Sequence, residues 1–243
     1  MNSYDIIIIG AGSVGTPLAM SLVEKKKKVL VIDAEASAGQ GQNKAAIGGI
    51  RATHSDASKI KIGLDSIEVF SNWKKKTGTN IGWMRNGYCF PVYSEHDERM
   101  LKNMLKVQQS QGLNIKWIDK KEIARLAPGI NEKNLKGGTF SPDDGSASPL
   151  LAINAFYETA IKAGAVFRFK EKVIKILKNK NAVKGVLTDK GEYSAPIVVN
   201  AAGAFAGELS KTVDINISVR PDCHEAGITE PVQTDIKPMI VDI

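Results

Sequence analysis

The sequence predicts an α/β fold, in which a parallel sheet is interleaved with a smaller α+β domain. The first observation is the isoleucine run at residues 6–9, which leads into a glycine-rich turn and then a helical pattern. The second is a similar apolar run at 197–200, which again reaches a glycine and a helix. Strands this apolar are typical of a parallel sheet, because both of its faces are buried. We therefore expect the sheet to begin early in the chain, to be interrupted, and to resume late.

The turn after the first strand carries the spacing of a dinucleotide-binding loop, GAGSVG, with Gly10, Gly12 and Gly15. Such glycines allow a tight turn and leave the N–H groups of a helix facing a phosphate. Asp33 ends the next apolar run, where a carboxylate can accept hydrogen bonds from both hydroxyls of an adenosine ribose. The pattern predicts a Rossmann-like domain that binds NAD or FAD rather than NADP. The alternative is an ordinary βαβ unit with a chance glycine pattern.

Composition excludes several classes of protein. The chain has 243 residues and 43% apolar composition, enough to bury a sizeable core. Its net charge of +7 comes from dispersed lysines, and the two lysine runs fall at the ends of predicted helices, so we expect no nucleic-acid partner. Cys89 and Cys223 share no metal or redox spacing. With no signal peptide or spanning segment evident, the sequence predicts a cytoplasmic protein without a metal site.

Capping and turn signals divide the rest of the chain. Helices are predicted at 58–78, from Ser94 to about Gln111, in a short stretch after Asp119, and from Ser148–Pro149 to Gly164. A hairpin is predicted around Asn86–Gly87. After Gly164 the pattern changes to short strands at 166–169, 172–179, 182–189 and 195–200.

Four segments together resemble the D-amino-acid oxidase-like (DAO) family of FAD-dependent oxidoreductases, which includes glycine oxidase, the sarcosine oxidases and the β subunits of proline dehydrogenase-type complexes. They are DIIIIGAGSVG, AAIGGIRATHSD, FSPDDGSASPLLAINAFYETAIKAGA and GVLTDKGEYSAPIVVNAAGAFAGEL. The resemblance implies that the nucleotide is FAD, kept as a bound prosthetic group. It also implies an FAD-binding domain from residues 1–82 plus 141–213 and a substrate domain from 83–140 plus 214–243.

The resemblance further implies which residues hold FAD. The three glycines would cradle the pyrophosphate and Asp33 the ribose, although many relatives carry Glu at this position. The backbone of Val173 would contact the adenine edge, or else Val173 and the alanines at 201–202 are plain sheet core. The lysine at position 44 gives no reason to expect a covalent flavin link. The full set is Gly10, Gly12, Ser13, Val14, Gly15, Asp33, Ala34, Lys44, Ala45, Ala46, Gly48, Gly49, Val173, Ala201, Ala202 and Gly203.

Arg51 matches an arginine that in certain relatives pairs with the substrate carboxylate. A guanidinium can bind a carboxylate through two parallel hydrogen bonds and so fix the Cα–H over the flavin. The alternative is that Arg51 only braces its loop by a salt bridge. His54 and Asp56 follow closely, but such a pair is common in polar loops, and we assign no catalytic residue. For His224, on a predicted strand, we expect a structural role.

The resemblance implies oxidation of the C–N bond of a small amino or imino acid, of the sarcosine, glycine, proline or D-amino-acid type, by hydride transfer to flavin. Two alternatives stay open: a flavin dehydrogenase of a 2-hydroxy acid or glycerol phosphate, and a non-catalytic flavin-binding subunit of a complex. Family members continue beyond the final MIVDI run. We therefore expect a fragment, or a chain completed by another subunit, that binds FAD poorly alone.

Overall fold

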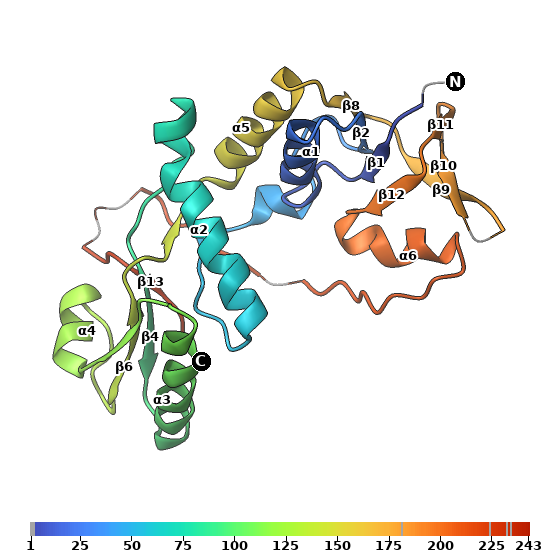
Figure 1. Cartoon of the computed structure of the whole chain (residues 1–243). Coiled ribbons are helices and arrows are strands. Elements are labelled where there is room, and N and C mark those ends of the chain that lie inside the picture. Colours follow the sequence, from blue (N-terminus) through green and yellow to red (C-terminus); the bar gives the residue numbers. More distant parts are fainter. Residues whose placement is uncertain (1–2, 181, 224, 232, 234) are drawn as a thin grey trace. The chain divides into compact units, whose positions relative to one another are not determined.

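The computed structural model describes residues 3–180, 182–223, 225–231, 233 and 235–243. Its chain forms two compact units (Figure 1). The first unit comprises Met1–Ala46 and Pro149–Ala226, and the second comprises Ile47–Ser148 and Gly227–Ile243. His224, expected to be structural, lies outside the described residues.

The first unit is built on a four-stranded parallel sheet. In sheet order its strands are β12 (Ile197–Asn200), β1 (Ile6–Ile9), β2 (Val29–Ile32) and β8 (Val166–Arg168). Every residue of β1 and β2 is buried, which explains why both are apolar at every position. The predicted α/β fold class is confirmed, and so is a sheet that is interrupted after β2 and resumed by β8 and β12.

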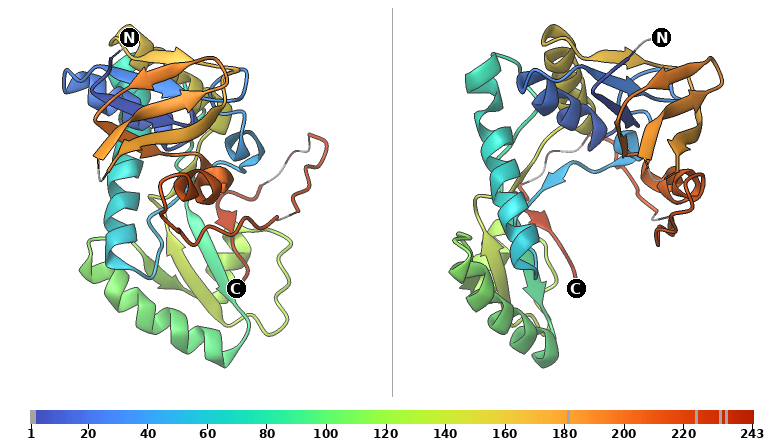
Figure 2. Two further views of the ribbon diagram at one scale, coloured as in Figure 1. Left: turned by 90° about the vertical axis from the view of Figure 1, so that its right-hand side faces the viewer. Right: turned by 45° about the vertical axis from the view of Figure 1, so that its right-hand side comes forward.

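Different layers cover the two faces of this sheet. Helices α1 (Gly15–Glu24) and α5 (Pro149–Lys162) pack on one face, where Ala19 and Ala160 contact the side chains of Ile6 and Ile8. On the other face Ile7 packs against an antiparallel sheet and the short helix α6 (Figure 2). That layer consists of β9 (Val173–Asn179), β10 (Ala182–Thr188), β11 (Glu192–Ser194) and α6 (Ala206–Lys211).

The second unit contains a mixed four-stranded sheet. Its strands, in order, are β13 (Met239–Ile240), β4 (Tyr88–Val92), β6 (Gly137–Ser141) and β5 (Lys116–Ile118), and only the β13–β4 pair is parallel. Cys89, on the interior strand β4, is fully buried among Ile118, Ile123 and Leu135. Helices α2 (Ala57–Thr77), α3 (Glu95–Ser110) and α4 (Lys120–Leu126) belong to this unit, as does the two-stranded sheet of β3 (Gly49–Ile50) and β7 (Gly145–Ser146).

The unit boundaries differ from the domain boundaries expected from the sequence. Residues 47–82 and 141–148 belong to the second unit rather than to the nucleotide-binding part, and 214–226 belong to the first. The reason is packing, because Ile60 and Ile67 of α2 bury their side chains against Leu113 and Ile115. Helical spacing in a sequence shows that a helix has an apolar face, and it does not show which core that face joins.

The four helices predicted from capping and turn signals are present, and α2 ends at Gly78 in the left-handed conformation, as predicted. The side chain that caps α2 is Asp56, which was not predicted to be a cap. Asp119 caps α4 by accepting a hydrogen bond from the Glu122 N–H, and α5 begins at Pro149. In the described part of the chain no helix is both long and apolar enough to cross a membrane.

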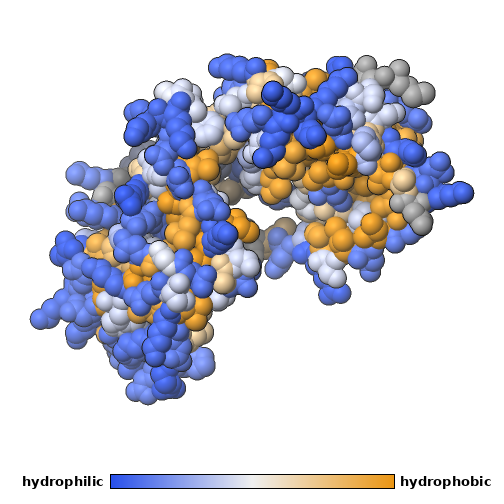
Figure 3. Space-filling model, in the orientation of Figure 1, coloured by the Kyte–Doolittle hydropathy of each residue, from blue (hydrophilic) through white to orange (hydrophobic). Residues whose placement is uncertain are grey.

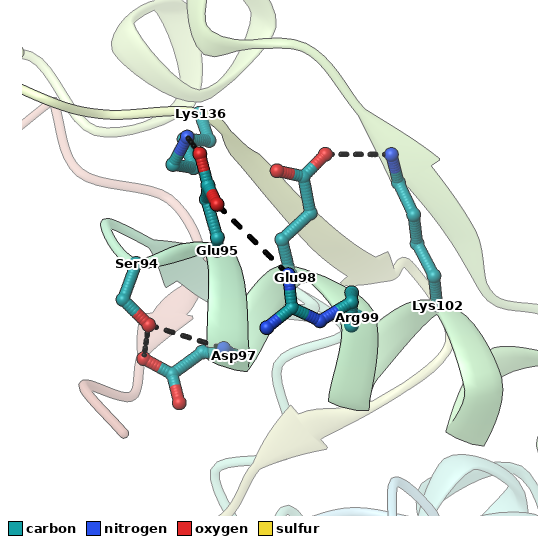
Figure 4. A network of polar contacts seen from close by, with 7 residues as sticks. All are labelled: Ser94, Glu95, Asp97, Glu98, Arg99, Lys102 and Lys136. Atoms are coloured by element: carbon teal, nitrogen blue, oxygen red, sulfur yellow. Dashed lines mark hydrogen bonds and ion pairs between the residues drawn. The ribbon is translucent and has the colours of Figure 1, made fainter.

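Helix α3 shows how such an end is stabilised (Figure 4). The Ser94 hydroxyl accepts a hydrogen bond from the Asp97 N–H at 3.1 Å. One turn further on, Lys102 pairs with Glu98 at 2.7 Å. Three acidic residues in the first turn, Glu95, Asp97 and Glu98, complement the positive end of the helix dipole.

The hairpin predicted around Asn86–Gly87 is wrong. Strand β4 pairs with β6 and β13 instead of with the residues before the turn. Met84 bridges to Ser146, and the Gly87 N–H donates to the Asp144 carbonyl at 2.8 Å. Gly87 does adopt a positive φ of 80°, so the turn residue was recognised correctly. Its partners come from a distant segment that a local signal cannot indicate.

Replacing Asp56 by Ala should lower the free energy of unfolding by about 1 kcal/mol, because the Ser58 and Lys59 N–H groups at the start of α2 lose their acceptor. Asp65→Ala, on the exposed surface of the same helix, is the matched control and should have little effect. Urea denaturation of the two variants measures the difference. Equal effects would show that capping does not stabilise α2.

Candidate functional site

Each glycine of the GAGSVG loop has a different structural constraint. Gly10 has a φ of 107°, and a Cβ there would overlap the Ala201 carbonyl oxygen. A Cβ at Gly15 would overlap the Gly10 carbonyl oxygen, where α1 packs against β1. At Gly12, by contrast, an added Cβ would meet no atom within 4 Å. These are the three roles of a dinucleotide-binding loop: a tight turn, an open approach for the pyrophosphate, and close helix–strand packing.

No side-chain cap and no acidic side chain of α1 competes with a bound phosphate for the backbone N–H groups at the N-terminus of this helix. Its N-cap residue, Val14, makes no side-chain capping bond, and the first turn holds no acidic residue. The Thr16 hydroxyl instead donates to the Ala11 carbonyl at 3.0 Å, which holds the loop against the helix. Pro17 occupies the third helical position, where a missing N–H costs little. The helix dipole and backbone N–H groups therefore face the opening beside Gly12.

Asp33 is held against the same loop. One carboxylate oxygen accepts from the Ala11 N–H at 2.6 Å and the other accepts from the Glu35 N–H at 2.8 Å. A carboxylate offers about four acceptor positions, so it can still receive ribose hydroxyls. The Glu171 N–H donates to the Asp33 carbonyl at 3.1 Å, which brings the start of β9, where Val173 lies, beside this end of the site. Val173 also packs on the core of the first unit.

The segment after β12 completes this edge of the sheet. The Ala201 N–H donates to the Ile9 carbonyl at 2.9 Å, and Gly203 adopts a positive φ of 54°. Ligands of open α/β sheets bind at the carboxyl ends of the strands, which is where these residues lie. Figure 3 shows apolar side chains at the surface over α1 and over the segment from β12 to α6, and Val14 and Phe205 are both 65% exposed.

The remaining candidate cofactor residues fall into two groups. Ala34, Lys44, Ala45 and Ala46 belong to the first unit, the last three in or next to the short 3-10 helix Gln42–Ala45, with exposed side chains. Gly48 and Gly49 belong to the second unit. A Cβ at Gly49 would overlap the Tyr88 hydroxyl, so packing inside the second unit alone requires glycine there.

Arg51 lines a cavity of about 220 Å³ in the second unit. Its Nη1 donates to the Thr53 carbonyl at 2.6 Å, and its guanidinium lies 5.5 Å from the ring centre of Phe90 and 5.9 Å from that of Tyr88. Among the described residues no carboxylate forms a salt bridge with Arg51. Arg51 therefore brings a positive charge to the cavity without an ion-pair partner to neutralise it.

His54 and Asp56 do not act as a pair. Asp56 caps α2 through the Ser58 and Lys59 N–H groups. Burial, together with the positive charges of Arg51 and Lys59, lowers the pKa of His54 below its ordinary value of 6.5. His54 lines the same cavity as Arg51.

Asp144 is the functional candidate that the sequence did not single out. It is fully buried, and its two carboxylate oxygens accept from the Ala52 N–H at 2.9 Å and from the Thr53 hydroxyl at 2.6 Å. Burial raises the pKa of the Asp144 carboxyl above its ordinary value of 3.8, although the hydrogen bonds and the Arg51 charge oppose this. The only sequence feature that could have indicated a special role for Asp144 is the aspartate pair before glycine in FSPDDGSASP. The same pattern is also typical of an exposed turn.

The parallel sheet, its glycine loop and Asp33 define a dinucleotide-binding protein, and the open space at Gly12 fits the pyrophosphate of FAD. The family model for FAD dependent oxidoreductases (DAO) matches residues 5–242, and the chain belongs to this family. FAD is the cofactor of the family, so the predicted resemblance and the cofactor are confirmed at this level.

By their names, several of the known proteins similar to this chain oxidise amino acids, and another is the mitochondrial pyruvate dehydrogenase phosphatase regulatory subunit of Mus musculus. Glycine oxidase of Geobacillus kaustophilus is 25% identical over 226 residues, which are 90% of this chain and 59% of that protein. Human mitochondrial dimethylglycine dehydrogenase is 24% identical over 228 residues, 94% of this chain and 26% of that protein. The crystal structure of L-proline dehydrogenase from P. horikoshii matches with a TM-score of 0.88 and 25% identity, covering 99% of this chain and 64% of that one. The chain thus spans less than two thirds of these relatives.

Two glycine substitutions should separate binding from folding. Gly12→Val should leave the thermal stability of the cofactor-free protein unchanged and abolish FAD binding, because the side chain fills the space for the pyrophosphate. Gly15→Ala should destabilise the protein by roughly 1–3 kcal/mol, because its Cβ overlaps backbone. Thermal melting and FAD titration followed by flavin fluorescence measure the two effects. FAD binding of native strength by Gly12→Val would exclude this loop as the pyrophosphate site.

The buried carboxyl of Asp144 should make stability depend on pH. Its pKa is higher in the folded than in the unfolded state, so the folded state holds the proton more tightly. Its contribution to stability is therefore fully present below pH 3.8 and is lost as the pH rises through the raised pKa.

Asp144→Asn lacks this titration. The difference in unfolding free energy, native minus variant, should fall as the pH rises through this window, as measured by denaturation at a series of pH values. Asp65→Asn controls for the loss of an exposed carboxylate. A difference that is constant with pH would contradict the assignment.

Proposed function

We propose that the protein is an FAD-dependent oxidoreductase that oxidises the C–N bond of a small amino or imino acid, with Arg51 as the group that binds the substrate carboxylate. The observation that carries this proposal is the Arg51 guanidinium, which lines a cavity without a salt-bridge partner among the described residues. A substrate carboxylate would supply the missing negative charge.

The names of similar proteins support the substrate class. Glycine, dimethylglycine and proline each carry an amine and a carboxylate on the same carbon atom. One arginine that holds the carboxylate by two parallel hydrogen bonds can orient all three substrates in the same way.

Different segments of the chain would bind different parts of FAD. The glycine loop, with Ser13 and Val14, and the segment 201–203 bind the pyrophosphate, while Asp33, Ala34 and Val173 bind the adenosine end. The stretch from Lys44 to Gly49 contacts the flavin. FAD, when bound, supplies the hydride acceptor, and the protein orients the substrate and excludes water. Hydride transfer starts from the neutral amine and needs no strong base, and burial lowers the pKa of the histidine in the cavity.

Other subunits of a hetero-oligomeric dehydrogenase or oxidase are the protein partners that fit this proposal.

The test begins with the purified protein as it is isolated. The nucleotide released on denaturation should be FAD, and NAD would contradict the proposal. Anaerobic flavin reduction is then measured with glycine, N,N-dimethylglycine and L-proline, each beside the matched amine without a carboxylate: methylamine, trimethylamine and pyrrolidine. We expect the amino acids to reduce the flavin and the amines to react poorly. Reduction by lactate or glycerol 3-phosphate alone would indicate a hydroxy-substrate dehydrogenase, and no reduction by any substrate a non-catalytic subunit.

Arg51→Lys should raise KM for the preferred amino acid and cost on the order of 1–3 kcal/mol in kcat/KM, because a lysine cannot make the paired hydrogen bonds. Reaction with the matched amine should be unchanged. Arg99→Lys, on an exposed position of α3, is the control and should behave as the native protein does. Unchanged kinetics in Arg51→Lys would exclude Arg51 as the carboxylate group.

A further inference from the structure

The direction of Arg51 is set by a main-chain oxygen rather than by an acid. Arg51 Nη1 donates to the Thr53 carbonyl at 2.6 Å, two residues along the same segment. A contact within so short a segment fixes the guanidinium only if the segment is itself fixed. The structure shows what fixes it.

The Asp144 carboxylate fastens the segment at two consecutive residues. Its Oδ1 accepts from the Ala52 N–H at 2.9 Å and its Oδ2 accepts from the Thr53 hydroxyl at 2.6 Å. The His54 N–H donates to the Ala52 carbonyl at 2.8 Å, which closes a tight three-residue turn centred on Thr53. The Thr53 carbonyl that receives Arg51 thus belongs to a turn anchored at its first two residues.

Neighbouring elements hold Asp144 and the turn in place. The Gly87 N–H donates to the Asp144 carbonyl at 2.8 Å, and residue 145 pairs with Ile50 in the β3–β7 sheet. On the other side α2 approaches so closely that a Cβ at Gly63 would lie 2.7 Å from the Ala52 Cα. Gln108 of α3 donates to the His54 carbonyl at 3.1 Å. Contacts on both sides therefore hold this anchor in place.

We propose that Asp144 and Thr53 are positioning residues for Arg51: the buried carboxylate orders the turn, and the turn aims the guanidinium into the cavity. This inference rests on the proposed function of Arg51. It explains why an acid is buried where no described salt bridge reaches it.

An indirect connection suits a carboxylate-binding arginine. An aspartate bonded directly to the guanidinium would occupy the N–H groups that a substrate needs and would neutralise their charge. Acting through the Thr53 hydroxyl and carbonyl, Asp144 orients Arg51 and takes none of its donors. The Phe90 and Tyr88 rings beside the guanidinium likewise leave its N–H groups free.

The test uses Thr53→Val, which keeps the shape of the side chain and removes the hydroxyl, beside Thr53→Ser, which keeps the hydroxyl. Loss of one hydrogen bond should raise KM for the preferred amino acid roughly fivefold to tenfold, with kcat within about twofold of native. KM for the matched amine without a carboxylate should not change. Thr53→Ser should restore the native KM. Asp144→Asn, in which the amide oxygen replaces only one of the two acceptors, should give the same selective rise.

A merely structural role predicts a different pattern. Thr53→Val would then lower the melting temperature while amino acid and amine are affected alike, and that result would overturn the proposal. If Thr53→Val does not fold, Asp144→Asn decides, with the rise in melting temperature of the holoprotein in L-proline against pyrrolidine as a second measure of carboxylate binding.

Arg51→Lys distinguishes failure of the positioning role from failure of the proposed function. If it loses the preference for the carboxylate while Thr53→Val and Asp144→Asn keep it, the positioning role is wrong and the proposed function stands. If Arg51→Lys itself keeps the preference, the proposed function of Arg51 is wrong, and the positioning role fails with it.

Discussion

The first unit depends on one close contact, the packing of the glycine loop between β1 and the segment after β12. Gly10 lies against the Ala201 carbonyl, and Gly15 lies against Gly10. These contacts join the beginning of the chain to the segment after β12. In the sequence, β12 comes after the main part of the second unit, Ile47–Ser148. Any side chain at either glycine would push the strand ends apart. Close packing at Gly10 and Gly15 fixes the path of the loop, and that path leaves open space beside Gly12.

The sequence predicted best those features that are decided within a few residues. The caps at Ser94 and Asp119 each satisfy an N–H three residues away, so the local sequence contains the whole interaction. The strand–glycine–helix pattern at 6–15 is equally local, and it predicted the parallel sheet and the cofactor class. The ribose-binding role of Asp33, inferred from its position at the end of the next strand, stays a prediction.

The features that were missed are decided over long distances. The turn at Gly87 has the conformation that its sequence indicates, yet its hydrogen-bond partner is Asp144. The same residue looks like part of a polar turn in the sequence and proves to be a buried acid that holds Ala52 and Thr53. The exception is a local contact: Arg51 Nη1 donates to the Thr53 carbonyl, two residues away. Residue types do not reveal such a contact, because every residue has a backbone carbonyl. The expectation that Arg51 binds the substrate carboxylate stays a prediction.

The position of Cys89 has a consequence of its own. The thiol lies on the interior strand β4, among side chains from β5 and α4, and burial raises its pKa to about 12. A thiol in this state is protonated at neutral pH, and only the thiolate is a nucleophile. Cys223, in contrast, is exposed. Chemical modification of Cys89 therefore requires the sheet of the second unit to open first, so that its rate depends on the opening of this one sheet.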